Sequence, residues 1–323
     1  MSHVQYYLCG GTGINIGVAL KAGARTSANK NAGYVGLDTS DKNNTAEFPI
    51  ERLEGAAGSG KDSTLLFEKM VPFVTSVLKK YKPAVHNIVV ANSAGGTGRA
   101  QAMIALRQLI EGGHQVALCL ISDHTSLIEK QNAVNGVRTF ANQTAANQLN
   151  APVCYLEFFN TEDKTRGEVN AEVVDNLNLL SLLFNPGNTE MDIEDVKRFF
   201  NYSAGGKIPP ALSRIRFYDQ DGASEYDGKP PVAVASLFTE SDLVVPRFSG
   251  SLYRTTGVFA DGVDGSDRPK KITELHVTLD HGEALVDLEK EIEELETAQA
   301  KAAVDYTKQK DISAGSNSMG FML

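Results

Sequence analysis

The feature that most constrains this chain is a series of short, almost continuously apolar segments that alternate with helix-like stretches in its first half. The apolar segments, expected to be strands, are residues 4–9, 34–38, 88–92, 116–121 and 153–159. Apolar strands separated by helices indicate a parallel sheet covered on both faces. Such sheets bind ligands beyond the carboxyl ends of their strands. The first half is therefore expected to be a Rossmann-like α/β domain.

Two glycine-rich turns stand between an apolar strand and a helix, where a phosphate site would lie. Residues 10–13 read Gly-Gly-Thr-Gly before a helix expected from Ile14, and residues 94–98 read Ala-Gly-Gly-Thr-Gly before a helix expected over residues 99–111. Glycine lets the backbone approach a phosphate, and a helix N-terminus supplies N–H groups and a positive dipole. The alternative for each turn is close packing without a ligand, but two such turns in one sheet favour a phosphate site.

A third glycine-rich segment, residues 55–62, resembles a P-loop. Asp62 stands where a P-loop has the hydroxyl residue that holds magnesium, and residues 48–53 before it are a poor buried strand. A surface loop is the better interpretation.

The second half has shorter expected strands, at residues 215–218, 232–238 and 272–279, separated by loops rich in glycine, aspartate and proline. A strong helix pattern over 167–185 precedes them, and a highly charged helix from Glu283 to about Lys310 follows. Two clean heptads in that last helix are too few for a coiled coil, so packing along the body is the expected role. We expect a smaller second α/β domain.

Composition excludes several classes of protein. The formal charge of −9 argues against non-specific nucleic-acid binding. No stretch approaches the roughly 20 apolar residues that span a bilayer, and residues 1–5 lack the features of a secretory signal. Cys9, Cys119 and Cys154 each lie in an apolar run, which predicts buried, reduced thiols and no metal site. A cytoplasmic location follows.

The motifs resemble those of the tubulin/FtsZ superfamily. Residues 94–98 match the start of its [SAG]-G-G-T-G-[SAT]-G signature, and residues 185–196 are similar to its R-P-G-x-x-N-x-D-x-A-D-V pattern without a gap. The chain length and C-terminal helix are most like those of the bacteriophage-encoded tubulins, the PhuZ group. The resemblance covers residues 4–200, and the second domain is barely recognisable by sequence.

The resemblance implies a polymerising GTPase that binds GTP or GDP with Mg²⁺ in a tubulin/FtsZ-like fold. It divides the chain into a GTP-binding domain (1–166), a central core helix (167–187), a catalytic loop and helix (188–204), a second domain (205–282), a C-terminal helix (283–312) and a tail (313–323). The implied nucleotide contacts are Gly10, Gly11, Thr12, Asn15, Asp38, Gly58, Ala94, Gly95, Gly96, Thr97, Gly98, Glu129, Arg166 and Asn170. Asn170 stands at the position that reads guanine, and Arg166 stands where the family often has an aromatic that covers the base.

In this family the loop after the central helix enters the nucleotide site of the next subunit, where two acids polarise the attacking water. By position these acids are Asp192 and Asp195. Taken alone, acids here are also typical of a helix N-terminal cap, and both roles can hold together. The implied partner is a second copy, stacked head to tail into a filament, with no nucleic acid and no membrane. The implied role is positioning of phage DNA or replication structures in the infected cell.

Departures from the family patterns leave alternatives open. Arg99 and Ala100 replace a small residue and a glycine, so Arg99 could contact phosphate, a neighbouring subunit or solvent; Glu190 replaces an asparagine. A filament protein without turnover and a monomeric dinucleotide-dependent oxidoreductase, with Asp38 on the ribose, are the rival hypotheses. Residues 319–323 are apolar after a polar linker, and we expect this tail to contact a neighbouring subunit; a disordered end is the alternative.

Overall fold

The structure is a computed structural model that describes residues 3–54, 67–144, 148–184, 188, 190–219, 230–239, 250–259, 272–279 and 281–316. In the first half, strands and helices alternate as the apolar periodicity predicts. The elements are β1 (Val4–Cys9), α1 (Gly10–Ala22), α2 (Ser27–Lys30), β2 (Gly33–Asp38), β3 (Ile50–Arg52), α3 (Phe67–Lys80), β4 (His86–Asn92), α4 (Gly96–Glu111), β5 (Gln115–Asp123), α5 (Leu127–Thr144), β6 (Val153–Asn160) and α6 (Arg166–Leu180).

The second half continues from α6 through a short 3₁₀ turn into a mixture of helices and strands. Its elements are η2 (Ser181–Phe184), α7 (Ile193–Phe200), η3 (Tyr202–Gly205), β7 (Leu212–Asp219), β8 (Ala233–Thr239), β9 (Tyr253–Phe259), β10 (Ile272–Thr278) and α8 (His281–Ser316). All ten strands join one sheet in the order β3-β2-β1-β4-β5-β6-β7-β10-β8-β9. The strands from β3 to β7 run parallel, whereas β10 is antiparallel to β7 and β8. The α/β fold class is therefore confirmed.

Alternate side chains of each central strand point to opposite faces of the sheet and belong to two separate hydrophobic cores. Tyr6 and Leu8 of β1 point into a core with α1 and α6, whereas Tyr7 and Cys9 point into a core with α3, α4 and α5. Both faces of the sheet are thus covered, which explains why these strands are apolar without alternation. The three cysteines are buried and free, as the apolar runs predicted.

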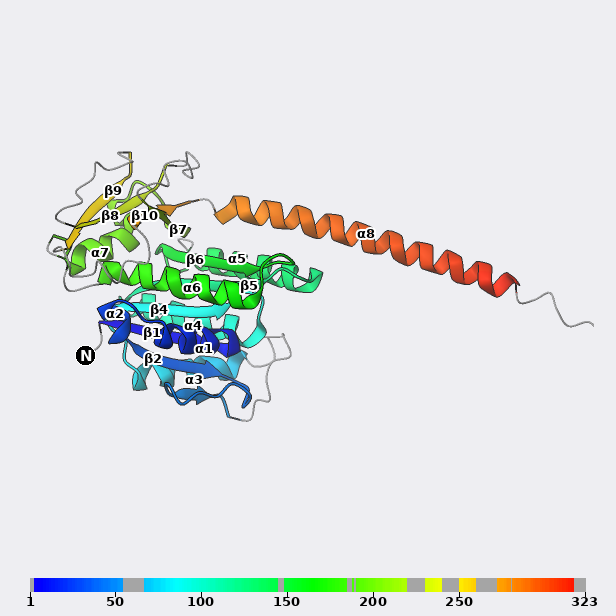
Figure 1. Cartoon of the computed structure of the whole chain (residues 1–323), viewed down its shortest axis with the longest axis horizontal. Coiled ribbons are helices and arrows are strands. Elements are labelled where there is room, and N and C mark those ends of the chain that lie inside the picture. The colour runs from blue at the N-terminus through cyan, green and yellow to red at the C-terminus, as the bar shows by residue number, and fades with distance from the viewer. Residues whose placement is uncertain are drawn as a thin grey trace, which may run out of the picture.

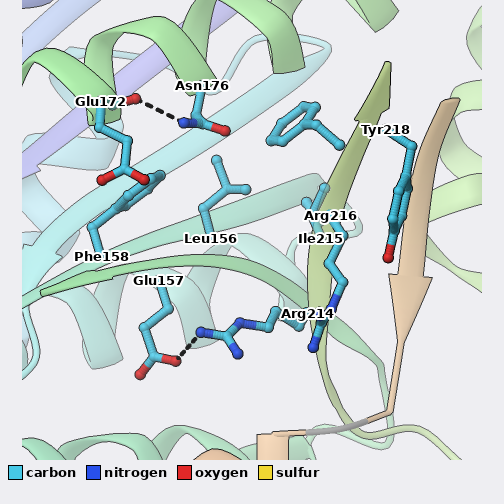
Figure 2. Close-up of a pocket in the computed structure, with 10 residues that line it drawn as sticks. Leu156, Glu157, Phe158, Glu172, Asn176, Arg214, Ile215, Arg216 and Tyr218 are labelled. Atoms are coloured by element: carbon cyan, nitrogen blue, oxygen red, sulfur yellow. Dashed lines mark hydrogen bonds and ion pairs between the residues drawn. The ribbon is translucent and has the colours of Figure 1, made fainter. Parts of the chain in front are cut away.

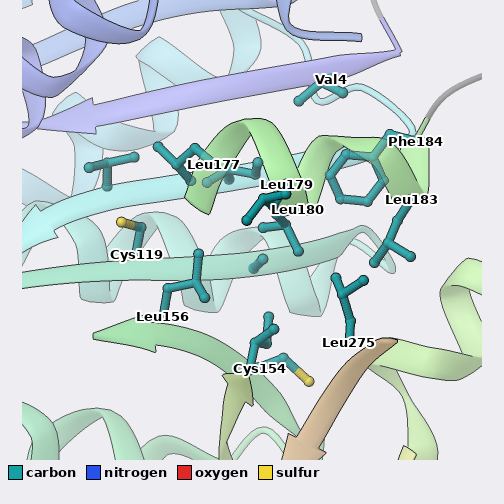
Figure 3. Close-up of a cluster of buried hydrophobic side chains, with 14 of the residues drawn as sticks. Val4, Cys119, Cys154, Leu156, Leu177, Leu179, Leu180, Leu183, Phe184 and Leu275 are labelled. Atoms are coloured by element: carbon teal, nitrogen blue, oxygen red, sulfur yellow. The ribbon is translucent and has the colours of Figure 1, made fainter. Parts of the chain in front are cut away.

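Helix α6 is the element around which the first core is built. Its buried residues Val169, Val173, Leu177 and Leu180 recur at helical spacing and face the sheet, and Phe184 of η2 extends the same row. Figure 3 shows Leu177, Leu179 and Leu180 beside Cys119 of β5 and Leu156 of β6. At 1.5 Å per residue, the 15 residues of α6 span about 22 Å along the sheet.

A buried polar network fixes the position of α6 against α1 and α2. The Asn178 side chain donates to the Gly23 carbonyl at 3.0 Å, and its Oδ1 accepts from the Arg25 backbone N–H at 3.0 Å and from Asn29 Nδ2 at 3.1 Å. Asn29 Oδ1 accepts in turn from the Tyr6 hydroxyl at 2.6 Å. Because these polar groups are buried, each depends on its partners to offset lost hydration.

The joint between the two halves of the sheet is short. Strand β7 pairs with β6 through only three residues before it turns to β10. Arg214 of β7 bonds the Glu157 carboxylate of β6 at 2.9 Å beside this divergence, where a cavity of about 280 Å³ opens between the two strands and α6 (Figure 2). None of the residues that line this cavity is among the sequence-predicted site residues.

Helix α8 packs on the body over its first part and then extends away from it (Figure 1). Lys130 of α5 bonds Glu291 at 2.6 Å, Gln131 bonds Glu296 at 2.6 Å, and Arg138 pairs with Glu289. The expectation that this helix packs along the body therefore holds only for its beginning. No helix in the described part of the chain is both long and apolar enough to cross a bilayer.

Several local expectations need correction. Residues 50–52 do form a strand, β3, which is half-buried at the sheet edge and pairs with β2. Strand β9 and the one-turn helix α2 had no clear signal in the sequence, since β9 mixes polar and apolar residues. Helices α1 and α4 begin at Gly10 and Gly96, inside the glycine turns, because the glycines themselves form the first helical turns.

We predict that replacing Asn178 by leucine lowers the free energy of unfolding by about 3 kcal/mol, because the Gly23 carbonyl, the Arg25 amide and the Asn29 side chain lose partners while buried. Urea denaturation at equilibrium would measure the change. The control is Asn31→Leu, which removes an exposed amide with only local bonds and is expected to change stability by less than about 0.5 kcal/mol. Equal losses in both variants would contradict the assignment.

Candidate functional site

The carboxyl ends of four parallel strands, β1, β4, β5 and β6, meet along one edge of the sheet, and a cavity of about 180 Å³ lies there. Five predicted nucleotide contacts line it: Thr12, Asn15, Glu129, Arg166 and Asn170. The other lining residues are Asn92, Ile121, Ser122, Asp123, Asn160 and Val169. The cavity is thus where α/β sheets bind ligands, and most of its lining is polar.

The two glycine turns pack directly against each other beside this cavity. Gly10 has a φ of +70°, and a Cβ on it would lie 3.1 Å from Gly98 Cα. A Cβ on Gly98 would lie 2.7 Å from the Cys9 carbonyl oxygen. Side chains at these two positions would push the turns apart, so glycine is what allows α1 and α4 to begin side by side.

A similar steric argument applies to the first turn of α1. A Cβ on Gly13 would lie 2.6 Å from the Val90 carbonyl oxygen, and one on Gly11 would lie 2.8 Å from the Asn43 side chain. Glycine at these two positions therefore lets the first turn of α1 pack closely against β1, β4 and the Asn43 side chain. First-turn amides of a helix have no partner within the helix, which makes two adjacent helix N-termini an anion site.

The second turn is held by the asparagine that ends β4. The Asn92 Oδ1 accepts from the backbone N–H of Ala94 at 2.8 Å and from that of Gly95 at 3.0 Å. These two amides therefore point at Asn92, and Gly95 serves as the N-cap of α4. The amides of Ala94 and Gly95 are therefore bonded within the turn itself.

Asp38 contacts this site through intermediaries. Its carboxylate is buried and accepts from the Thr39 N–H at 2.8 Å and from Asn43 Nδ2 at 2.6 Å. Asn43 packs under Gly11, and the Thr39 hydroxyl lies 2.9 Å from the Thr97 hydroxyl. Asp38 thereby holds the loop after β2 against both glycine turns.

The far side of the cavity carries an anchored carboxylate. Asp123, at the end of β5, accepts from the Thr125 N–H at 3.0 Å, from the Thr125 hydroxyl and from Asn160 Nδ2 at 3.0 Å, while Arg166 Nη2 bonds its other oxygen at 2.8 Å. Burial alone would raise the pKa of Asp123, but these donors outweigh it and lower the pKa to about 2. The carboxylate is therefore ionised at neutral pH.

Arg166 lies across the mouth of the cavity. It is the first residue of α6, which Thr165 and Glu168 cap reciprocally, and its side chain is 79% exposed despite the bond to Asp123. Glu129 of α5 is close enough to raise the pKa of Arg166 further, after the larger effect of Asp123. Asn170 follows one turn later on the same face of α6.

Arg99 is directed away from the phosphate side. Its side chain is half-buried, and Nη1 donates to the Asn132 carbonyl of α5 at 3.2 Å. A Cβ on Gly136 of α5 would lie 3.3 Å from the Arg99 side chain and 2.3 Å from the Ser93 carbonyl oxygen. Arg99 therefore joins α4 to α5 in this structure.

The two candidate catalytic acids lie at the opposite end of α6, near the amino ends of the strands. Asp192 caps α7, accepting from the N–H groups of Glu194 at 2.8 Å and Asp195 at 3.0 Å, and Asp195 accepts in return from the Asp192 N–H at 3.1 Å. His3 and His86, which mark the amino ends of β1 and β4, line one cavity of about 400 Å³ together with Asp192. Both acids therefore act as helix caps. Within one subunit they lie at the opposite end of α6 from the cavity at the carboxyl ends of the strands.

The acid loop is also attached to the second half of the sheet. The Tyr253 hydroxyl of β9 donates to Asp195 Oδ1 at 2.9 Å. Asn188 Oδ1 accepts from the N–H groups of Glu190 at 3.1 Å, Met191 at 2.9 Å and Val258 at 3.2 Å. The loop is therefore bonded to β9, and Asp192 remains exposed at its tip.

Sequence reasoning missed three residues of the site. Asp123, Asn160 and Asn92 are the last residues of β5, β6 and β4. A polar residue at the carboxyl end of an apolar strand was the available signal, because those ends converge at the ligand edge. Gly58 lies outside the described residues.

The arrangement fits a nucleotide. Adjacent helix N-termini beside bare glycine backbone suit phosphates, and the amides of Asn15, Asn160 and Asn170 can donate to and accept from a base edge. No group of three or more metal-type ligands stands together among the described residues. Mg²⁺ in nucleotide sites relies largely on phosphate oxygens and water, so the donor set is compatible with it.

Comparison with known proteins gives a consistent result. A scan against models of protein families found no match. The chain is 29% identical over 305 residues to a phage tubulin-like protein of Pseudomonas phage PhiPA3, covering 92% of this chain and 91% of the relative. It is 24% identical over 324 residues to the phage tubulin-like protein of Pseudomonas phage phiKZ, covering 95% and 93%.

Solved structures share the fold. The structure of the phage tubulin PhuZ with GDP superposes with a TM-score of 0.82 at 18% identity, and the PhuZ201 filament with 0.81 at 18%; each comparison covers 93% of both chains. An FtsZ from M. jannaschii superposes with a TM-score of 0.62 at 14% identity over 85% of this chain and 89% of its own. The chain is therefore similar over nine-tenths of its length to phage tubulin-like proteins, and it shares its fold with PhuZ and FtsZ structures.

Proposed function

We propose that this protein is a GTPase that polymerises head to tail, and that its catalytic site is completed between two subunits. The observation that carries the proposal is the separation of the two parts of the site. The cavity lies at the carboxyl edge of the sheet, whereas Asp192 and Asp195 lie beyond the opposite end of α6, a helix about 22 Å long. Stacking one copy on another would bring the acids of one to the cavity of the next.

A head-to-tail contact of this kind does not close on itself, so it propagates as a filament. Similar solved structures support this, since one is the PhuZ201 filament and another a protofilament of TubZ from bacteriophage PhiKZ. A third holds GDP, which supports a guanine nucleotide as the ligand. The exposed Ile193 beside Asp192 is apolar surface that such a contact would bury.

Within the proposed site, each part of the cavity has a distinct role. The first-turn amides of α1 and α4 hold the phosphates and stabilise the negative charge that develops in the transition state. The Asn170 amide reads the guanine edge, and the Arg166 guanidinium covers the base. Bound Mg²⁺ would neutralise charge on the phosphate oxygens.

Asp192 and Asp195 of the neighbouring subunit orient the attacking water and accept its proton. Their own capping bonds hold both carboxylates in place before docking. Hydrolysis removes phosphate contacts at the interface and so weakens the longitudinal contact, which makes the filament dynamic. Catalysis therefore takes place only in the assembled form.

The two rival hypotheses are less well supported. Asp38 is buried, and its carboxylate bonds Thr39 and Asn43, so it offers no exposed acid for the ribose contact of a dinucleotide oxidoreductase. The alternative is a filament protein that binds nucleotide without hydrolysing it. Whether Asp192 and Asp195 support GTP hydrolysis distinguishes the two.

Since the relatives come from Pseudomonas phages, we further propose that the filaments act in the cytoplasm of an infected bacterium and position phage DNA or replication structures. No direct contact with nucleic acid or membrane is part of the proposal. The apolar tail lies outside the described residues, and we propose that it contacts a neighbouring subunit.

The first prediction concerns the acids. Asp192→Asn is expected to keep the α7 cap, because asparagine caps as well as aspartate, and to lower the GTPase rate per subunit by about 10²-fold while assembly persists. GTPase rate and light scattering would be measured against protein concentration. In the native protein both are expected to rise above the same threshold.

The matched control is Glu194→Gln, which removes an exposed carboxylate in the same helical turn and should retain turnover. A native rate in Asp192→Asn would exclude this acid from catalysis. A native rate per subunit that is independent of concentration, without scattering, would contradict the shared site.

The second prediction concerns the contact between the glycine turns. Gly98→Ala places a Cβ 2.7 Å from the Cys9 carbonyl oxygen, so the turns must separate and the affinity for a fluorescent GDP should fall at least about tenfold. Gly205→Ala, where a Cβ meets nothing within 4 Å, is the control. Equilibrium titration would measure both, and native affinity in Gly98→Ala would contradict the phosphate site.

The third prediction concerns the tail. Deleting residues 313–323 is expected to raise the critical concentration for assembly severalfold, because the subunit interface would lose apolar contact area. Sedimentation at a series of protein concentrations would measure it. An unchanged critical concentration would show that the tail makes no contribution to the filament.

A further inference from the structure

The Asp123–Arg166 pair is the feature of the cavity that the proposed roles leave unexplained. Asp123 is buried at the end of β5, whereas the Arg166 side chain is 79% exposed at the start of α6. A pair with one exposed long side chain contributes little to stability in general. Its position at the cavity mouth therefore points to a role in ligand binding.

The carboxylate of this pair is fixed independently of the arginine. One oxygen accepts from the Thr125 N–H, the Thr125 hydroxyl and Asn160 Nδ2, and the other meets Arg166 at 2.8 Å. Three donors on two elements thus anchor the carboxylate, and its low pKa keeps it charged. Arg166 is the exposed member of the pair, and the anchored Asp123 carboxylate defines where its guanidinium lies.

The position of the guanidinium matters because of its chemistry. A guanidinium is planar and weakly hydrated, so it can stack on an aromatic base while its edge remains hydrogen-bonded. A lysine would supply the positive charge but no planar group to stack on the base. An aromatic side chain would supply the plane without needing a carboxylate.

We propose that Asp123 is a positioning residue that holds the Arg166 guanidinium over the cavity mouth as a latch on the nucleotide base, so that the Asp123–Arg166 contact sets the rate of nucleotide release. The inference rests on the proposed function, since it assumes a purine nucleotide in this cavity. The latch opens when Arg166 leaves Asp123, and added salt weakens the contact by screening.

The test measures release of N-methylanthraniloyl-GDP from full-length protein by stopped flow, with unlabelled GDP as the competitor. Asp123→Asn keeps an acceptor oxygen for Thr125 and replaces the acceptor for Arg166 by a donor. Both Asp123→Asn and Arg166→Ala are expected to release the label roughly five- to twentyfold faster, with no further increase when they are combined.

The variant Arg166→Phe serves as a background that shows whether Asp123 acts by positioning Arg166 or by stabilising the structure in general. Arg166→Phe is expected to cover the base without Asp123, so its release should be slow, insensitive to salt and unaffected by adding Asp123→Asn. Release from native protein should quicken as KCl is raised. Arg166→Lys should release the label faster than native protein, because it lacks the plane.

Circular dichroism and thermal melting would establish that each variant is folded. A native release rate in Asp123→Asn would overturn the latch, as would equal acceleration by Asp123→Asn in the native and R166F backgrounds. Failure of the native protein to bind the labelled GDP in an equilibrium titration would instead refute the proposed function, so the two failures are distinguishable.

Discussion

The site depends first on a backbone contact between two glycine turns. Gly10 and Gly98 lie so close that a Cβ on either would meet the other turn, and this contact brings the N-termini of α1 and α4 together at one edge of the sheet. Everything else around the cavity is arranged on that base: Asn92 closes the second turn, and Asp38 holds the neighbouring loop through Asn43. The proposed phosphate site therefore follows from backbone packing and requires no cationic side chain.

The second requirement is a spacer of fixed length, which α6 supplies. Its apolar row faces the sheet, and Asn178 bonds the segment after α1 through groups that are buried. One end of α6 carries Arg166 and Asn170 at the cavity, and the chain beyond its other end carries the acid loop. Because both apolar and polar contacts hold the helix, the distance between the cavity and the acid loop, the two parts of the proposed site, is fixed within the single subunit.

Sequence reasoning predicted the elements that depend on local pattern. The apolar runs gave the central strands, and the glycine turns marked the ligand edge. It failed where the decisive contact is between distant segments: Asp123, Asn160 and Arg166 meet only because β5, β6 and α6 converge. Strand β9 was missed because its polar residues, such as Arg254, are explained by partners on other strands, here Glu274 of β10. The sequence also did not predict that α8 extends away from the rest of the protein, because its pattern of charged residues does not show which part of the helix packs against other elements.

The capping and catalytic interpretations of the acids reinforce each other. An isolated exposed carboxylate would lose side-chain freedom on docking, and this would oppose assembly. In this loop the freedom is already lost within the subunit, because Asp192 and Asp195 are bound to each other's backbone and Tyr253 holds Asp195. Asn188 attaches the same loop to β9, so the acids and the second half of the sheet form one unit. Any rotation of that half about the short β6–β7 joint would carry the acids with it, and would couple the shape of a subunit to its ability to complete a neighbour's site.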